Sequence, residues 1–158
     1  AIIATVALIL LTFAAAAIVI SFIVPFVQNS LTGSSECLSY NDYFKFEEDF
    51  GYNCKNGTNY LVSVRAAGVD NETEKIVSGL SLAFFNLGES TVVEIDKGAS
   101  NSDVWMLSGG NLAIPKSGEV RTFVYNNSAT FEKVEVYPKL GNGRLCEMSD
   151  EIILEEIC

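Results

Sequence analysis

The sequence predicts an α+β protein, in which a long hydrophobic N-terminal α-helix precedes an all-β, immunoglobulin-like sandwich head. No ionisable side chain occurs before Glu36. Downstream, short apolar runs alternate with turns rich in Gly and Asn, which is the pattern of strands. All four cysteines lie in this second part, as in a disulfide-stabilised domain. We therefore expect an assembly or membrane helix over 1–31, a linker over 32–36 and an extracellular head over 37–158.

The first 27 residues are apolar or small except for Thr5, Thr12, Ser21 and Pro25. About 20 such residues suffice to cross a hydrocarbon layer as a helix. Because apolar side chains cover every face, this cannot be a surface helix with one buried stripe, and something apolar must surround it. Pro25 is expected to bend the helix or mark its end, and Gly33 to stop it.

The head is predicted to contain eight strands, at 43–46, 60–66, 75–85, 91–95, 103–107, 120–125, 131–137 and 152–157. Alternation is clearest in 133–136, where two valines face one way and Lys133 and Glu135 the other, and in 62–66. Turns are expected at Asn56-Gly57, at 109–110 and at 141–143. Seven aromatic side chains are assigned to the sandwich core rather than to an adhesive surface: Phe44, Phe46, Phe84, Phe85, Trp105, Phe123 and Tyr125.

The cysteines are Cys37, Cys54, Cys146 and Cys158, and none belongs to a CxxC pair. Two disulfides in an oxidising compartment fit this spacing better than a zinc site or four buried thiols. Of the three possible connectivities, we favour Cys37–Cys54 with Cys146–Cys158, because each closes a short loop worth roughly 3 kcal/mol of chain entropy.

Composition excludes several functions. A net charge of −10 and a pI near 4.3 disfavour nucleic-acid binding, and the chain has no histidine. No nucleophile elbow, phosphate loop or paired-carboxylate motif is present, so we expect no enzyme, cofactor or metal. The acidic groups at 47–49 and at Asp70, Glu72 and Glu74 lack EF-hand spacing and are predicted to be solvated loops.

Three tripeptides match the N-glycosylation pattern, at Asn56, Asn71 and Asn126. Each lies beside turn-forming residues or between strand-like runs. Together with the cysteines and the apolar segment, these sites predict an extracytoplasmic glycoprotein.

The hydrophobic run starts at Ala1, and no Lys or Arg precedes it. A single-pass anchor normally carries basic residues on its cytoplasmic flank. Removal of a basic leader immediately before Ala1 explains both features, although a chain shortened at this point for another reason would look the same.

The opening sequence from Ala1 to Leu11 resembles the mature start of archaeal type IV pilins. The resemblance covers roughly residues 1–31 and rests on composition and placement. It implies that a prepilin peptidase removes the leader, and that the subunit waits in the cytoplasmic membrane for the pilus assembly machinery. Helices then bundle into the core of a homopolymeric surface filament, with β-rich heads outside, for adhesion. Bacterial pilins usually carry Glu at the fifth mature position, where this chain has Thr5.

In this interpretation alanines let neighbouring helices approach closely and larger residues pack between them. The core positions would be Ile2, Ile3, Ala4, Ala7, Leu8, Leu11, Ala14, Ala15, Ile18 and Phe22. Archaellins of motility filaments share this helix plan. The other alternative is a monomeric, membrane-anchored extracellular binding domain with the same helix in lipid.

Overall fold

The structure is a computed structural model that describes residues 2–50, 52–68, 70–98 and 102–158, without the side chains of Phe22, Phe26 and 29–34. It divides into two compact units, Ala1–Leu38 and Ser39–Cys158. We describe each unit by itself.

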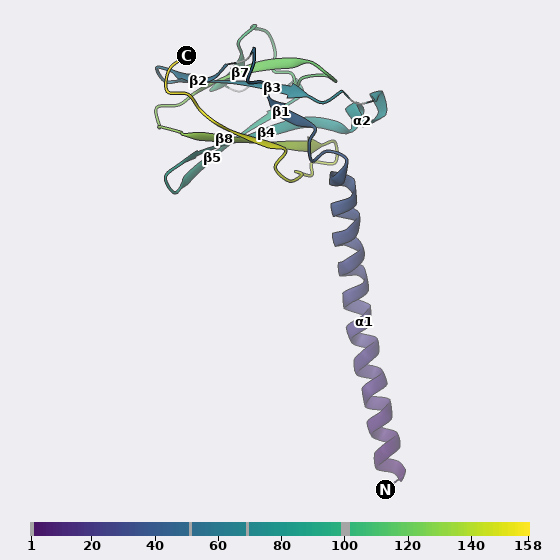
Figure 1. Ribbon diagram of the computed structural model, residues 1–158. Helices are drawn as coiled ribbons and strands as arrows, with labels where there is room; N and C mark the ends of the chain where they lie inside the picture. Colours follow the sequence, from purple (N-terminus) through teal and green to yellow (C-terminus); the bar gives the residue numbers. More distant parts are fainter. Residues whose placement is uncertain (1, 51, 69, 99–101) are drawn as a thin grey trace. The chain divides into compact units, whose positions relative to one another are not determined.

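The first unit is a single helix, α1, which spans Ile2–Leu38. Figure 1 shows it as one continuous helix through Pro25. The helix passes the predicted end at residue 31, so the expected linker over 32–36 is helical. Gly33 does not stop it, because a glycine inside a helix costs only about 1 kcal/mol relative to alanine.

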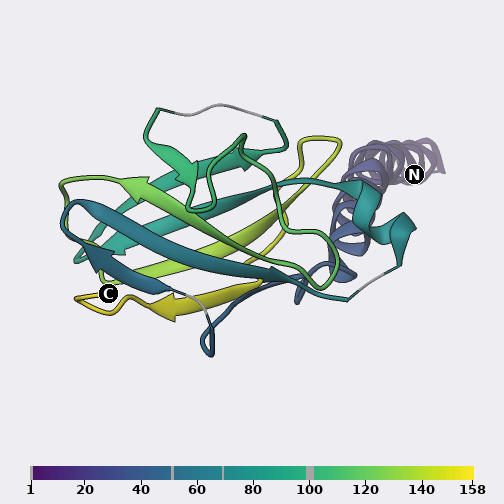
Figure 2. The ribbon, with the colours of Figure 1, turned by 90° about the horizontal axis from the view of Figure 1, so that it is seen from above.

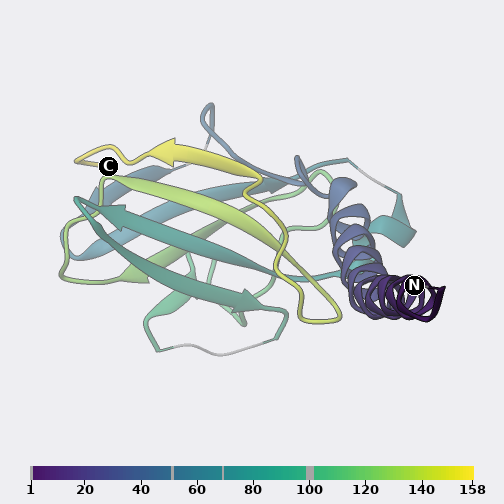
Figure 3. The same ribbon diagram turned by 90° about the horizontal axis from the view of Figure 1, so that it is seen from below.

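The second unit is a sandwich of two antiparallel sheets, drawn from opposite sides in Figures 2 and 3. Sheet A has the order β1-β3-β7-β6, with β2 also paired to β3. Sheet B has the order β5-β4-β8-β9. Sheet A consists of β1 (Phe44–Phe46), β2 (Asn53–Asn56), β3 (Asn59–Ala66), β6 (Val104–Met106) and β7 (Val120–Asn126); sheet B consists of β4 (Val77–Asn86), β5 (Glu89–Asp96), β8 (Lys133–Leu140) and β9 (Asp150–Ile153).

This strand order confirms the predicted immunoglobulin-like sandwich. In the strand nomenclature of immunoglobulin domains, β3 corresponds to the strand called B. The sheet β1-β3-β7-β6 then has the immunoglobulin order A-B-E-D, and the sheet β5-β4-β8-β9 has the order C′-C-F-G. Every predicted run overlaps an observed strand. Two elements were not predicted: β2, and the short helix α2 (Asn71–Ile76), which takes the first two residues of the predicted 75–85 strand.

The core lies between the sheets and is built by the predicted alternation. Val134 and Val136 are fully buried, as are the three inward residues 62, 64 and 66 of β3. An aromatic cluster joins the two sheets, with ring centroids 4.9–6.3 Å apart among Tyr60, Phe84, Tyr125 and Phe131. Of the seven aromatics assigned to the core, Trp105 on the edge strand β6 is 39% exposed and Phe85 is half-buried; the other five are buried.

Local chemistry explains the β2–β3 hairpin and α2. Asn56 pairs with Asn59 across a two-residue turn, and Gly57 takes the positive φ of 65° that such turns favour at this position. Asp70 caps α2, since its carboxylate accepts a hydrogen bond of 2.8 Å from the Thr73 amide. This contact lowers the pKa of Asp70.

Candidate assembly helix and the surface of the head

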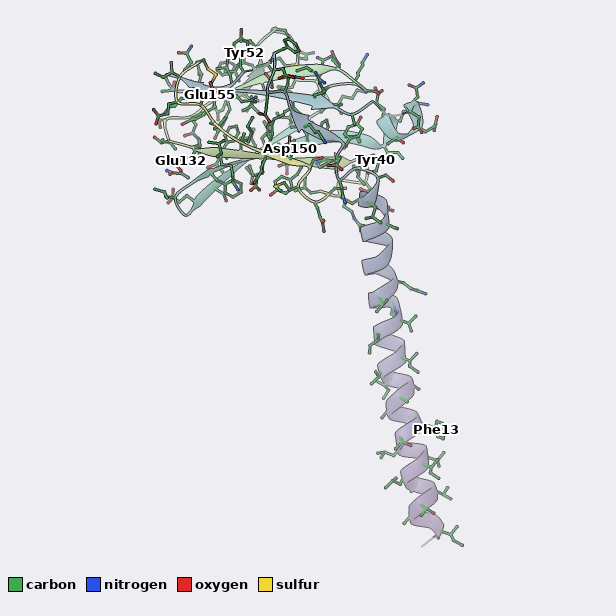
Figure 4. All side chains as sticks on the ribbon, viewed as in Figure 1. Phe13, Tyr40, Tyr52, Glu132, Asp150 and Glu155 are labelled. Carbon is green, nitrogen blue, oxygen red and sulfur yellow. A yellow bond between two sulfur atoms is a disulfide. The ribbon has the colours of Figure 1, made fainter. Side chains whose placement is uncertain are left out.

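The side chains of α1 are exposed on every face. Ile2 and Ile3 are 80% and 86% exposed, and none of the described residues of Ile2–Pro25 is buried. Figure 4 shows Phe13 projecting away from the helix. Nine of the ten residues predicted for a filament core are exposed in the single chain, and the side chain of the tenth, Phe22, lies outside the described residues. A helix of this kind needs an apolar environment supplied by other molecules.

Three alanines of α1 share one face with two larger apolar residues. Ala4, Ala7, Leu11, Ala14 and Ile18 follow one another at spacings of three and four, which places them on a common face. Bulkier residues occupy the opposite side: Val6, Ile9, Phe13, Ile20 and Val24. The alanine face allows a neighbouring backbone to approach closely.

The hydroxyl groups of the apolar span are satisfied within α1. Thr5 donates to the Ile2 carbonyl and Thr12 to the Ile9 carbonyl, both at 2.8 Å, and Ser21 donates to the Ile18 carbonyl at 2.7 Å. Placing a hydroxyl in an apolar medium without a partner costs several kcal/mol. These three groups avoid that cost, so the helix is suited to a dry environment. By length and composition, Ile2–Pro25 is able to cross a membrane.

The disulfides differ from the predicted pairing. Cys54 in β2 is bonded to Cys158, across a sequence separation of 104 residues. Both predicted pairs are therefore wrong, because each uses one of these two cysteines. Cys37 and Cys146 are disulfide-bonded as well. The argument from short loops failed because the sandwich brings β2 and the C-terminal segment side by side, and chain entropy alone cannot anticipate that. Disulfides and the apolar helix together indicate a secreted or membrane-anchored protein with an extracytoplasmic head.

The C-terminal segment connects the two sheets. After β9 it leaves sheet B and pairs in parallel with β2, at Cys54 and Glu155. The Glu155 amide donates to the Asn53 carbonyl and the Lys55 amide to the Glu155 carbonyl, both at 2.9 Å. The Cys54–Cys158 disulfide fixes this crossing covalently.

Glu47 is not part of a solvated loop as predicted, since only 5% of it is exposed. Its carboxylate forms an ion pair with Arg65 of β3, and its amide donates to the Ser63 carbonyl at 2.9 Å. The Asn53 amide group donates to the Glu47 carbonyl at 2.8 Å, which binds the β1–β2 loop to sheet A. The neighbouring Glu48 and Asp49 are exposed, as expected.

The outer face of sheet B carries a network of charges. Lys133 is paired with Glu135 and Glu151, and Lys139 with Glu94 and Asp96. The Tyr137 hydroxyl donates to Glu135. Burial, together with this hydrogen bond, raises the pKa of Tyr137 to about 12.

The acidic residues of the head do not gather into a metal site. Among the described residues, no group of three or more His, Cys, Asp or Glu side chains is placed to hold a metal ion. Asp70, Glu72 and Glu74 were expected in a loop, but the first caps α2 and the other two lie within it.

The three glycosylation motifs are exposed at their asparagines. Asn56 ends β2, Asn71 begins α2 and Asn126 ends β7. The Asn126 amide nitrogen donates to Thr58 at 3.2 Å and to Asn59 at 2.8 Å, so two of the motifs lie against each other.

No protein-family model matches the chain, and no curated protein matches it significantly in sequence. Among solved structures, it is similar to astrotactin-2, a vertebrate-specific, perforin-like membrane protein, with 15% identity and a TM-score of 0.39 over 73% of this chain. The chain spans only 21% of that protein. It is also similar to a superoxide reductase, with 18% identity and a TM-score of 0.35 over 71% of this chain and 85% of that one. At these TM-scores neither similarity assigns a function.

Proposed function

We propose that this chain is the structural subunit of an archaeal type IV pilus-like surface filament. In the filament, α1 packs against copies of itself to form the core, and the immunoglobulin-like heads face the medium and make the surface contacts of adhesion. The subunit is held in the cytoplasmic membrane through α1 before assembly, where a prepilin peptidase and the assembly machinery are its partners. Its role is structural rather than catalytic.

The observation that carries the proposal is the helix itself. It runs for 37 residues, about 55 Å at 1.5 Å per residue, whereas the apolar span Ile2–Pro25 covers only about 36 Å of that length. In the remainder, six of the seven residues at 29–35 are Asn, Ser, Thr or Gly, which are poor helix formers. A helix of such residues is marginal unless it packs against something. Lateral packing of many copies provides that support along the whole of α1.

The test is the behaviour of native material after the cells are sheared without detergent. A filament sediments as long polymer in the absence of detergent, and negative-stain microscopy shows fibres of uniform diameter. Recovery of the chain only from membranes, as a monomer released by detergent, would contradict the proposal.

A monomeric, membrane-anchored ectodomain is the second candidate, because the span Ile2–Pro25 alone matches the thickness of a bilayer. The head would then act as a binding domain on a single helix. The shearing experiment separates the two candidates, since only this one predicts that all of the protein stays with the membrane.

We also propose that the head carries N-linked glycan. Asn56 is a better acceptor than Asn126, because Asn126 uses its amide nitrogen in two hydrogen bonds that a sugar would disturb. Mass spectrometry of native protein is expected to find glycan at Asn56 and less or none at Asn126. Three unmodified asparagines would contradict the proposal.

A further inference from the structure

A surface groove lies along the seam between the two sheets, that is, along the line where the edge of sheet A faces β9 of sheet B. Toward one end of β9 the seam is closed by side chains: the Phe44 amide donates to Ser149 at 3.1 Å and the Phe46 amide to Asp150 at 2.9 Å. Toward the other end it is closed by the pairing of Glu155 with β2. Between these closures is a groove of about 520 Å³, lined by Glu48, Tyr52, Asn53, Cys54, Glu151, Ile152, Ile153, Glu155 and Cys158.

One wall of the groove is a strand edge with open backbone groups. The Leu154 amide donates to the Glu132 carbonyl of the segment before β8 at 2.8 Å. In an antiparallel pair alternate residues bond to the neighbouring strand. The backbone of Glu151 and Ile153 therefore faces away from β8, on the same side as Glu155, whose backbone bonds to β2. Two positions of this edge are thus available to another strand.

The groove is acidic, and its apolar residues are accessible. Glu48, Glu151 and Glu155 belong to its lining, and none of the described lining residues is Lys or Arg. Glu151 is paired with Lys133, whereas no ion pair of Glu48 or Glu155 occurs in the part of the chain that the structure describes. Tyr52 is 50% exposed and Ile153 76%. Figure 4 labels Tyr52 and Glu155, which lie toward the same end of the head.

We propose that this groove binds a short extended segment of a partner protein in which Lys or Arg alternates with apolar residues. The segment adds to the edge of β9 through backbone hydrogen bonds. Alternate side chains of a strand point to opposite faces. The basic set lies on the face of β9 that carries Glu151, and the apolar set on the face that carries Ile152, which also lines the groove. At about 3.3 Å per residue, the two open positions accommodate three to four residues.

Charge identifies the occupant as a different protein rather than a second copy. Another head would bring the same net charge of −10, and its Lys and Arg residues are scattered singly along the sequence. The attraction between a cationic segment and this groove is also expected to weaken with salt, as it does for solvent-exposed charges.

The test uses the full chain in a nonionic detergent and a fluorescein-labelled hexapeptide of alternating Lys and Val. Fluorescence polarisation is expected to show saturable binding. The variant E48Q/E151Q/E155Q should weaken it about tenfold, which corresponds to about 1.4 kcal/mol shared by three exposed charge contacts. The matched control E72Q/E89Q/E147Q has the same net charge and should change the affinity less than about twofold. Equal weakening by both variants would overturn the proposal, because it would show general attraction to an acidic protein.

Strand addition is tested separately from charge. A peptide with the same composition in the order Lys-Lys-Lys-Val-Val-Val keeps the charge and loses the alternation, so it should bind at least about tenfold more weakly. Ile153→Pro removes an amide that faces the groove while sparing the bonds to β8, and it should abolish binding with little change in the Tm of the head. Equal affinity for the two peptides would overturn the proposal, whether or not Ile153→Pro folds. Self-association of the heads through the groove, lost in E48Q/E151Q/E155Q, would also overturn it.

Discussion

The helix and the head have opposite relations to water. In the head the largest apolar side chains are enclosed by their own chain, and Tyr60, Phe84 and Val64 are fully buried. In α1 the apolar side chains are as large, yet they remain exposed. The head therefore obtains its hydrophobic stabilisation from internal contacts, whereas α1 can obtain it only from lipid or from other subunits. A substitution should therefore be able to disrupt assembly through α1 without unfolding the head, or unfold the head without changing α1.

The largest effect is expected from a charge placed in the helix. Ala15→Glu puts a carboxylate in a span with no cationic partner, and burying an unpaired charge costs several kcal/mol in every subunit. We expect polymer to disappear from sedimentation assays while circular dichroism shows an unchanged head.

The matched control is Leu87→Glu, at the exposed β4–β5 turn of the head. This substitution should leave assembly intact. Normal filaments from Ala15→Glu, or loss of filaments in both variants, would contradict the assignment of α1 to the core.

The next largest effect concerns the Cys54–Cys158 disulfide. Replacing both cysteines by serine releases a loop of about 100 residues, which corresponds to about 4–5 kcal/mol in the chain-entropy account. Denaturant unfolding should show this loss in the head, and hydrogen exchange should show the C-terminal segment opening first. A change below about 1 kcal/mol would mean that the backbone pairing of Glu155 with β2 holds the segment without the disulfide.

A smaller effect distinguishes two buried tyrosines. The Tyr60 hydroxyl donates to the Ala129 carbonyl at 2.6 Å and accepts from the Phe131 amide at 3.1 Å. The Tyr43 hydroxyl is buried with no hydrogen-bond partner among the described residues. Tyr60→Phe leaves an amide unpaired and should cost about 1–3 kcal/mol, whereas Tyr43→Phe should be neutral or stabilising. Equal losses of stability in Tyr60→Phe and Tyr43→Phe, measured by thermal unfolding, would contradict this account of the head interior.

The smallest effect is a dependence on alkaline pH. The pKa of Tyr137 is raised from 10.0 to about 12, so the folded state favours the protonated phenol. The resulting stability is complete below pH 10 and is lost as the pH rises from about 10 to about 12. Tm should fall over this range, and it should fall less in Tyr137→Phe. If Tm falls equally steeply with pH in the wild type and in Tyr137→Phe, the effect belongs to other titrating groups.

Local patterns were sufficient to predict the described strands of the sandwich except β2. Alternation in β3 and β8 reflects one buried and one exposed face, and this information lies within a few residues. The strand β2, with the sequence Asn-Cys-Lys-Asn, has no such pattern. It is a strand because the turn at Gly57 folds it onto β3. The helix α2 has only six residues, and its one strong signal is the cap at Asp70.

Features that depend on distant residues could not be predicted. The burial of Glu47 requires Arg65 and the β1–β2 loop to meet over sheet A. The Cys54–Cys158 pairing and the groove beside it arise where the C-terminal segment crosses to β2. The carboxylates of the groove come from two parts of the sequence about 100 residues apart, at Glu48 and at 151–155, and no spacing rule connects them.

The most direct test of the central claim is electron cryomicroscopy of filaments sheared from native cells. The account predicts a helical polymer in which α1 of each subunit packs against neighbouring copies along the axis, with Ala4, Ala7 and Ala14 at close helix contacts and the heads on the outer surface. A polymer held together by its heads with α1 outside the core would contradict the account. So would native material that contains only single copies with α1 in lipid.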